Sequence, residues 1–354
     1  MSRFRYQPST LATAPFHLIP LQSFQPGDRR VSPRIQISIP EVSMKYLLRT
    51  SLSVALLSAI AVAAPLPSSV RPAIPAEVQQ LISVDYRMLK NSDTAQQLKN
   101  QVFPDQLKQF EVALRGAGID PDRDVDQLTF VSYRSPKHGL EIVGAAQGVF
   151  ATKTVLRKLK LKKVKAVKYH DSDIYPMSDS MEMTFVDETT LLFGDAPALR
   201  GALDARDGYV ATLDSNPDIA NLIGDVESGA VWSVLDQKGT QNMMLSALGD
   251  ASHIGEYDTV KKHILGSRYT MNFSGGVNFD LDVLTSDSVT AATLSSLVKM
   301  GVLYKKMSAS SVEKAALEDV SVNSDSSKLQ MHFKADDKQF QSLIHTSLFA
   351  AVSR

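Results

Sequence analysis

The sequence contains no cysteine and only one tryptophan among its 354 residues. The absence of cysteine excludes disulfide bonds, thiol nucleophiles, thiolate metal ligands and iron–sulfur clusters, because each of these needs a cysteine sulfur. It also excludes a lipid attached to an N-terminal cysteine. A chain of this length can fold without disulfides, because its hydrophobic residues, 44% of the total, are sufficient for a large core.

The sequence also lacks a long apolar run and an overall excess of charge. The apolar run at residues 51–62 is shorter than the about 20 residues that a membrane span needs, and no run of that length follows. The formal net charge is zero, but seven of the 38 basic and two of the 38 acidic residues lie in residues 1–63. The remainder therefore has about five negative charges in excess. We predict no transmembrane segment in the mature chain and no nucleic-acid partner, since nucleic-acid binders need a basic surface.

The clearest pattern in the sequence is a secretory signal. It begins at the internal Met44 with a short basic region, and the apolar run of residues 51–62 follows. Ala61 and Ala63 form the small-x-small pair that signal peptidase recognises, so we predict cleavage between Ala63 and Ala64. The prediction places the mature protein in the periplasm or outside the cell, and an uncleaved membrane anchor is the alternative.

The signal peptide, residues 44–63, separates a leader from the folded part of the chain. Residues 1–43 contain six prolines and clustered arginines without a helix or strand period, which predicts disorder. Because a signal works from the extreme N-terminus, we interpret this leader as non-native, from a start codon assigned too far upstream. Residues 64–76 are predicted to be a linker, followed by two α+β domains at residues 77–224 and 225–354.

From residue 77 onward the sequence predicts an α+β fold of curved antiparallel sheets with helices packed on one face. Short loops join neighbouring strands into antiparallel pairs, and a helical pattern follows each pair. Alternating apolar and polar residues at 277–283 indicate one buried and one solvated face. The predicted units are strands 128–134 and 139–149 with helix 152–160, strands 181–187 and 190–193 with helix 196–205, strands 268–273 and 277–284 with helix 288–303, and strands 320–323 and 328–334 with helix 337–350.

The repeated strand–strand–helix order predicts two similar halves that meet near residues 216–229. The sequence leaves open whether the halves form one continuous sheet. Each helix that ends a unit begins beside a side-chain oxygen that can accept the unpaired N–H groups of its first turn. The predicted capping residues are Thr152, Asp195, Ser286 or Asp287, and Asp336.

Two segments of the predicted units resemble segments of known proteins. They are residues 189–204 (TTLLFGDAPALRGALD) and residues 229–236 (GAVWSVLD). Both resemble segments of bacterial exported proteins of unknown function, and the resemblance extends over most of residues 77–352. It implies an envelope protein built from repeated α+β units. It implies no activity and no site residues, because the shared features are turns and core positions.

Four carboxylates alternate along one loop, at Asp120, Asp122, Asp124 and Asp126. Alternating carboxylates are typical of calcium loops, but an EF-hand also needs a glycine at its sixth position and a glutamate at its twelfth. Counted from Asp120, both positions are valine. We therefore predict a turn from a helix into a strand here, without a metal. Phosphate-loop and dinucleotide fingerprints are also absent, so the sequence predicts no cofactor.

Histidines lie beside carboxylates in two segments. Neither segment has the His-Glu-x-x-His spacing that places two imidazoles on one face of a helix. The sequence therefore favours solvent-facing histidines on loops and helix ends over metal ligands. The two groups are His170 with Asp171 and Asp173, and His253 with Glu256 and His263.

Ser311 and Lys314 match the Ser-x-x-Lys pattern, which supplies a nucleophile and its base in penicillin-binding enzymes. Ser310 and Glu313 fit a helix capping box at the same place. No Lys-Thr-Gly follows and no Gly-x-Ser-x-Gly occurs, so the capping box is the favoured interpretation. Trp232 is flanked by apolar residues and is predicted to lie in the core.

Basic residues crowd residues 153–168, where they alternate with apolar residues. One explanation is a solvated helix face with lysines that protect an edge strand. The other is a dock for an anionic envelope polymer, a lipid headgroup or an acidic protein. The predicted contact residues for such a partner are Lys158, Lys160, Lys162 and Lys163.

The sequence predicts an exported bacterial envelope protein of unknown function that acts as a non-enzymatic binding or assembly module. The alternative is an envelope hydrolase whose catalytic residues are dispersed in the sequence and gathered by the fold, because such sites are defined by geometry and not by chain order. A cleft with converging histidine, serine and acidic groups would favour the hydrolase. An open groove or sheet face beside the lysines would favour the binding module.

Overall fold

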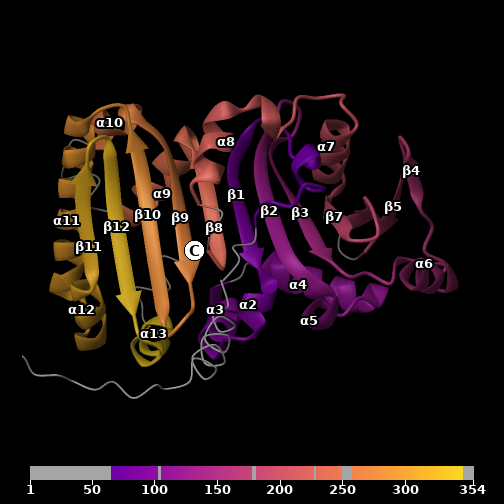
Figure 1. The fold of residues 1–354 in the computed structure, drawn as a ribbon, viewed down its shortest axis with the longest axis horizontal. Coiled ribbons are helices and arrows are strands. Elements are labelled where there is room, and N and C mark those ends of the chain that lie inside the picture. The colour runs from indigo at the N-terminus through magenta and orange to yellow at the C-terminus, as the bar shows by residue number, and fades with distance from the viewer. Residues whose placement is uncertain (1–64, 103–104, 178–180, 227–228, 249–256, 346–354) are drawn as a thin grey trace, which may run out of the picture. The chain divides into compact units, whose positions relative to one another are not determined.

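Twelve antiparallel strands form one open sheet in the computed structural model, which describes residues 65–345 except 103–104, 178–180, 227–228 and 249–256 (Figure 1). The predicted leader and the signal residues Met44, Ala61, Ala63 and Ala64 lie outside these residues. The order of strands is β11-β12-β10-β9-β8-β1-β2-β3-β7-β6-β5-β4. No helix within the described ranges is long and apolar enough to span a membrane.

The bounds of the elements follow the chain from the first strand to the last helix. The strands are β1 (Val78–Asp85), β2 (Val125–Ser135), β3 (Gly139–Gly148), β4 (Val167–Tyr169), β5 (Ser172–Pro176), β6 (Met181–Phe185), β7 (Thr190–Asp195), β8 (Val231–Asp236), β9 (Ile264–Asn272), β10 (Val277–Thr285), β11 (Val320–Asp325) and β12 (Lys328–Ala335). The helices are η1 (Arg71–Ala73), α2 (Tyr86–Lys90), α3 (Asp93–Val102), α4 (Asp105–Ala117), α5 (Pro121–Asp124), α6 (Thr152–Leu161), α7 (Ala196–Arg206), η2 (Leu213–Ser215), α8 (Pro217–Gly224), α9 (Gln237–Leu248), α10 (Tyr257–Val260), η4 (Lys261–His263), α11 (Ser288–Ser308), α12 (Ser311–Glu318) and α13 (Asp337–Ile344).

Two halves of similar topology meet where β1 pairs with β8, with Ser83 opposite Trp232. In each half the first strand pairs with a long hairpin, β2–β3 or β9–β10, and α6 or α11 follows that hairpin. The second hairpin, β6–β7 or β11–β12, then joins the sheet through its second strand. The predicted antiparallel α+β fold with repeated strand–strand–helix units is confirmed. The sheet runs without a break across the predicted domain boundary at residue 224.

One face of the sheet carries most of the helices. In the first half, Leu128 belongs to a buried cluster with Phe110 of α4 and Val155 of α6. In the second half, Leu281 lies in a cluster with Leu294 of α11. Burial of such side chains provides the main favourable free energy of folding, about 1.5–3 kcal/mol for each fully buried large aliphatic residue.

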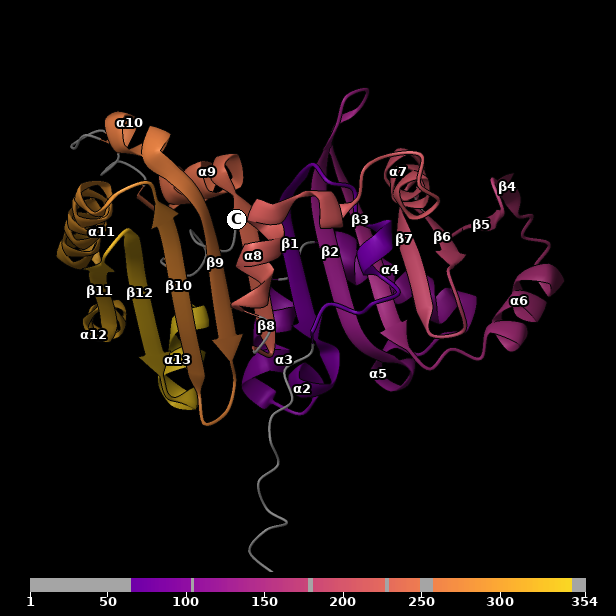
Figure 2. The same cartoon turned by 45° about the horizontal axis from the view of Figure 1, so that its top comes forward.

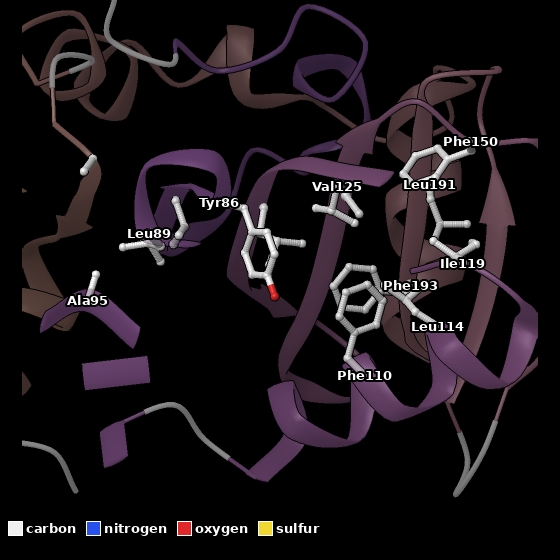
Figure 3. Close-up of a cluster of buried hydrophobic side chains, with 14 of the residues drawn as sticks. Tyr86, Leu89, Ala95, Phe110, Leu114, Ile119, Val125, Phe150, Leu191 and Phe193 are labelled. Atoms are coloured by element: carbon white, nitrogen blue, oxygen red, sulfur yellow. The ribbon is translucent and has the colours of Figure 1, made fainter. Parts of the chain in front are cut away.

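Two aromatic rings join α4 to the sheet in this core. Phe110 of α4 stacks on Phe193 of β7 with 3.5 Å between ring centroids (Figure 3). The ring of Phe193 lies over Gly144 of β3, where an added Cβ would come within 2.1 Å of its Cζ atom. The stack therefore requires a residue without a side chain at position 144.

The opposite face differs between the halves. In the first half it is covered by α7 and α8, and Trp232 lies in that core with a relative exposure of 1%, as predicted. In the second half, β9 to β12 present polar residues on this side, among them Thr270, Asp280 and His332. Figure 1 shows these strands on the open side of the sheet. The predicted alternation along β10 is confirmed, because Leu281 is buried and Asp280 is exposed.

The predicted helix caps are partly confirmed. Asp287 accepts a hydrogen bond from the Thr290 N–H, and Asp336 forms a capping box at α13. Asp195 is the N-cap residue of α7, but its side chain accepts no hydrogen bond from the first turn. Thr152 lies inside α6 and its hydroxyl bonds back to a carbonyl, so the capping position falls on the preceding alanine. The predictions for Asp195 and Thr152 were therefore wrong.

Candidate functional site

The eight basic residues of the segment 153–168 lie together at one end of the sheet. They lie on α6, on β4 and in the loop between them, residues 152–169, which we call the basic edge. β4 is the last strand in the sheet order and pairs only with β5. Val155 and Leu159 hold α6 on the core, which leaves its charged residues outside. All eight basic residues are exposed: Lys153, Arg157, Lys158, Lys160, Lys162, Lys163, Lys165 and Lys168.

Two of the four predicted contact lysines, Lys158 and Lys162, contact other parts of the protein. The Nζ atom of Lys162 donates a hydrogen bond to the carbonyl oxygen of Gly116 at 2.6 Å. The side chain of Lys158 passes over Gly118, where an added Cβ would lie 2.7 Å from its Nζ atom. Both ammonium groups therefore lie near the C-terminal end of α4, whose unpaired carbonyls attract positive charge. Lys162 links α6 to the end of α4 through this hydrogen bond, and the side chain of Lys158 lies over Gly118.

The other two predicted lysines remain available to a partner. Lys160 and Lys163 form no hydrogen bond or ion pair through their side chains with any residue that the structure describes. The backbone of Lys163 has a φ of 57°, and its N–H closes the end of α6 on the carbonyl of Lys160. This left-handed turn, usually made by glycine, directs the chain from α6 toward β4.

A polar and aromatic cluster fixes the far end of the basic edge to α7. His170, in the β4–β5 turn, places Nε2 3.0 Å from an Asp204 oxygen and stacks on Tyr209. The hydroxyl of Tyr169 donates to the same oxygen at 2.8 Å. Burial and this hydrogen bond raise the pKa of Tyr169. The cluster keeps β4 in place although β4 has only one neighbouring strand.

The histidine groups of the sequence do not converge on a metal geometry within the described ranges. Asp173 pairs with Lys168 at 3.2 Å, away from the Asp204 contact of His170. His263 lies near Ser286, with 3.2 Å between Nδ1 and Oγ. His253 and Glu256 lie outside the described residues. No group of three or more histidine or carboxylate side chains suited to a metal ion occurs among the residues described.

Arginines pair with all four carboxylates of the acidic loop. The loop follows the predicted course, from Gly118 with its φ of 91° through the short helix α5 into β2. A hydrogen bond from Arg123 holds the pKa of Asp124 below its usual value. Three arginines thus offset most of the negative charge of the four carboxylates. The pairs are Asp120 and Asp122 with Arg115, Asp124 with Arg123, and Asp126 with Arg87.

The Ser-x-x-Lys segment begins α12, and the predicted capping box is confirmed. The Ser310 hydroxyl accepts the Glu313 N–H, and the Glu313 carboxylate accepts the Ser310 N–H at 2.8 Å. Ser311 lines a shallow hollow of about 400 Å³ between α12 and α13, and Lys314 is not part of its lining. The hollow therefore does not bring together the two groups that the Ser-x-x-Lys chemistry needs.

A larger groove lies where the two halves meet, between α8 and strands β1, β2, β8 and β9. Its volume is about 490 Å³, and its lining includes Arg134 and Arg268. Arg134 donates to Asp236 at 2.7 Å, and Arg268 donates to Asp282 at 2.9 Å. The described lining holds no histidine, serine or lysine, and its ionisable side chains are arginines and carboxylates. No sequence motif indicated this groove, because its residues come from strands about a hundred positions apart.

The fold defines an antiparallel α+β protein. No protein-family model matches the chain, and no curated protein matches it. Two crystal forms of the bacterial protein TP0453 are similar in structure. Form I has a TM-score of 0.43 and 8% identity, and the match covers 80% of this chain and 98% of that chain. Form IV has a TM-score of 0.41 and 7% identity, with coverage of 78% and 96%.

Proposed function

We propose that this chain is an exported protein of the bacterial envelope that binds an anionic partner on its basic edge and acts without catalysis. The supporting observation is a group of exposed cations that form no ion pair with any residue in the described part of the chain. Only two carboxylates, Asp171 and Asp173, lie between residues 151 and 176 to offset them. The group consists of Lys153, Arg157, Lys160, Lys163 and Lys165.

Contacts within the protein hold α6 and β4, the two elements of the basic edge, in place. Lys158, Lys162 and two buried apolar residues fix α6, and the His170 cluster fixes β4. A rigid support lowers the entropy cost of holding several lysines toward one partner. Each lysine near an anionic surface contributes about 1 kcal/mol of attraction. If the lysines only prevented β4 from pairing with strands of other chains, they would not bind an anionic partner.

Export to the periplasm or the exterior is part of the same proposal. It is supported by the signal that begins at Met44 and by the alanines before Ala64, which make a complete secretory pattern in the sequence. A cysteine-free chain is suited to an oxidising compartment, because it has no thiol to mispair. The partner classes that fit the basic edge are an anionic envelope polymer, a lipid headgroup and an acidic protein.

The test neutralises the three available lysines at the end of α6. In the full chain, Lys160→Gln/Lys163→Gln/Lys165→Gln should weaken retention on an immobilised acidic polysaccharide by at least about tenfold at low salt. The variant should also lose most of the salt dependence of binding. Lys158 and Lys162 are left unchanged because they hold α6 in place.

The matched control removes the same charge from the other half of the sheet. Lys328→Gln/Lys334→Gln/Lys338→Gln should bind as the parent does, which separates a local contact from a general effect of net charge. Equal retention of the parent and the Lys160/Lys163/Lys165 variant on the polysaccharide would contradict the proposed function and leave the edge-protecting role of the lysines.

A further inference from the structure

A second unusual surface lies at the other end of the sheet, on the C-terminal half of α11 (Figure 2). Four large apolar side chains are exposed there: Met300 by 44%, Leu303 by 61%, Tyr304 by 49% and Met307 by 82%. Their spacing of three and four residues places them along one side of the helix. We call these four residues the apolar stripe.

The apolar stripe points away from the protein core. The buried residues of α11, among them Ala291, Leu294 and Leu297, face the sheet and lie in its first half. At 100° per residue, Met300, Leu303 and Met307 fall on the opposite side of the helix from Ala291 and Leu294. Tyr304 follows Leu297 by seven residues and lies at the edge of the stripe nearest to the core. The stripe is therefore not an unfinished part of the core but a separate outward surface.

The charges around the stripe have one sign. Lys299, Lys305 and Lys306 lie on the same turns, and no aspartate or glutamate occurs between Asp287 and Glu313. None of the three ammonium groups pairs with a carboxylate among the described residues. A helix with exposed apolar residues on one side and lysines beside them is typical of segments that lie in the headgroup region of a membrane.

We infer that the C-terminal half of α11 docks on the surface of an anionic lipid bilayer. Leu303 and Met307 enter the boundary between headgroups and acyl chains, and Tyr304 keeps its hydroxyl among the headgroups. The lysines contact lipid phosphates. α11 lies on the membrane without crossing it, since it lacks the length and hydropathy of a span.

The charges favour a bilayer over a second copy of the chain. A two-fold contact through the apolar stripe would place Lys299, Lys305 and Lys306 of one copy beside those of the other, which is repulsive. The negative charge of an anionic bilayer attracts the same three lysines. The inference goes beyond the proposed function, because it concerns different residues at the opposite end of the sheet, so either can fail without the other.

The experiment measures binding of the full chain to vesicles of phosphatidylcholine with and without phosphatidylglycerol. Leu303→Ser/Met307→Ser should reduce co-sedimentation with the anionic vesicles by about tenfold, because the stripe loses most of its apolar area. Lys299→Gln/Lys305→Gln/Lys306→Gln should remove the preference for phosphatidylglycerol. The matched control, Val112→Ser/Leu245→Ser, changes two exposed apolar residues on α4 and α9 and should bind as the parent.

A direct readout comes from Leu303→Trp, since the native Trp232 is buried and contributes a constant signal. Its fluorescence should shift to the blue when anionic vesicles are added, whereas a tryptophan at Leu245 should not respond. Unchanged circular dichroism would show that the serine variants fold. The inference is overturned if parent and Leu303→Ser/Met307→Ser bind vesicles equally, or if the stripe residues instead hold two copies together in solution, as light scattering would reveal.

Discussion

At the scale of single residues, the close packing around Gly144 is the most restrictive feature of the core. Phe193 occupies the space where a side chain at position 144 would be, and Phe110 stacks on its other side. A well-packed interior has little room for a displaced ring. The residue at position 144 of β3 therefore determines whether the Phe193 ring can stay in place and α4 can pack against it.

Gly144→Ala should destabilise the protein by about 1–3 kcal/mol, because the new methyl group must displace the Phe193 ring. Urea unfolding of parent and variant measures the difference. Gly116→Ala in α4 is the matched control, since no atom lies within 4 Å of its added Cβ. That control should be neutral or slightly stabilising. A Gly144→Ala protein as stable as the parent would show that the ring moves freely.

The role of Lys158 and Lys162 could not be read from the sequence. The sequence predicted the basic edge from composition, and these two lysines are chemically identical to Lys160 and Lys163. What separates them is the C-terminal end of α4, which lies more than forty residues earlier in the chain. The three-dimensional position of that helix end distinguishes Lys158 and Lys162, which lie beside it, from Lys160 and Lys163, which can contact a partner.

At the scale of elements, the start of α11 depends on one carboxylate. The Thr290 N–H, the Ser286 hydroxyl and the Thr290 hydroxyl donate hydrogen bonds to Asp287 and lower its pKa to about 2. The value in an unfolded chain is about 3.9. Because the folded pKa is the lower one, the charged cap stabilises the protein fully above about pH 4 and ceases to do so as the pH falls to 2.

Asp287→Ala should therefore lower the urea midpoint at pH 7, and the difference from the parent should shrink as the pH falls from about 4 toward 2. Glu188→Ala removes an exposed carboxylate in the β6–β7 turn and serves as control, with no change in midpoint at either pH. A difference between parent and Asp287→Ala that stays constant down to pH 2 would show that the cap does not act through its charge.

The elements with strong local signals were predicted well. The hairpins β6–β7, β9–β10 and β11–β12 and the helices after them have alternating strands and turn residues that are visible in the sequence. The edge strand expected after the basic helix is β4, and contacts of Tyr169 and His170 with α7 hold it in place.

At the scale of the whole molecule, the single sheet could not be predicted from the sequence. Its centre is the pairing of β1 with β8, whose partners, such as Ser83 and Trp232, lie about 150 positions apart. No local pattern encodes a contact at that separation. The groove with Arg134 and Arg268 escaped prediction for the same reason, because it exists only where the two halves meet.

The proposed export makes a prediction for the chain as a whole. Protein isolated from its native host should begin at Ala64, and no peptide from residues 1–43 should accompany it, because the signal that starts at Met44 is removed. Mass spectrometry of the intact protein measures both. Recovery of a cytoplasmic species that retains Arg29 and Arg30 would contradict the start site and the export together.

The pairing of β1 with β8 also has a consequence during synthesis. The first half emerges from the ribosome with all its own strands, but one side of β1 has no neighbour until residues 231–236 appear. At about 5–20 residues per second, the nascent chain carries this open edge for roughly 8–30 s. An open edge recruits other strands. We therefore expect a holding chaperone to bind the nascent chain until β8 pairs with the open side of β1.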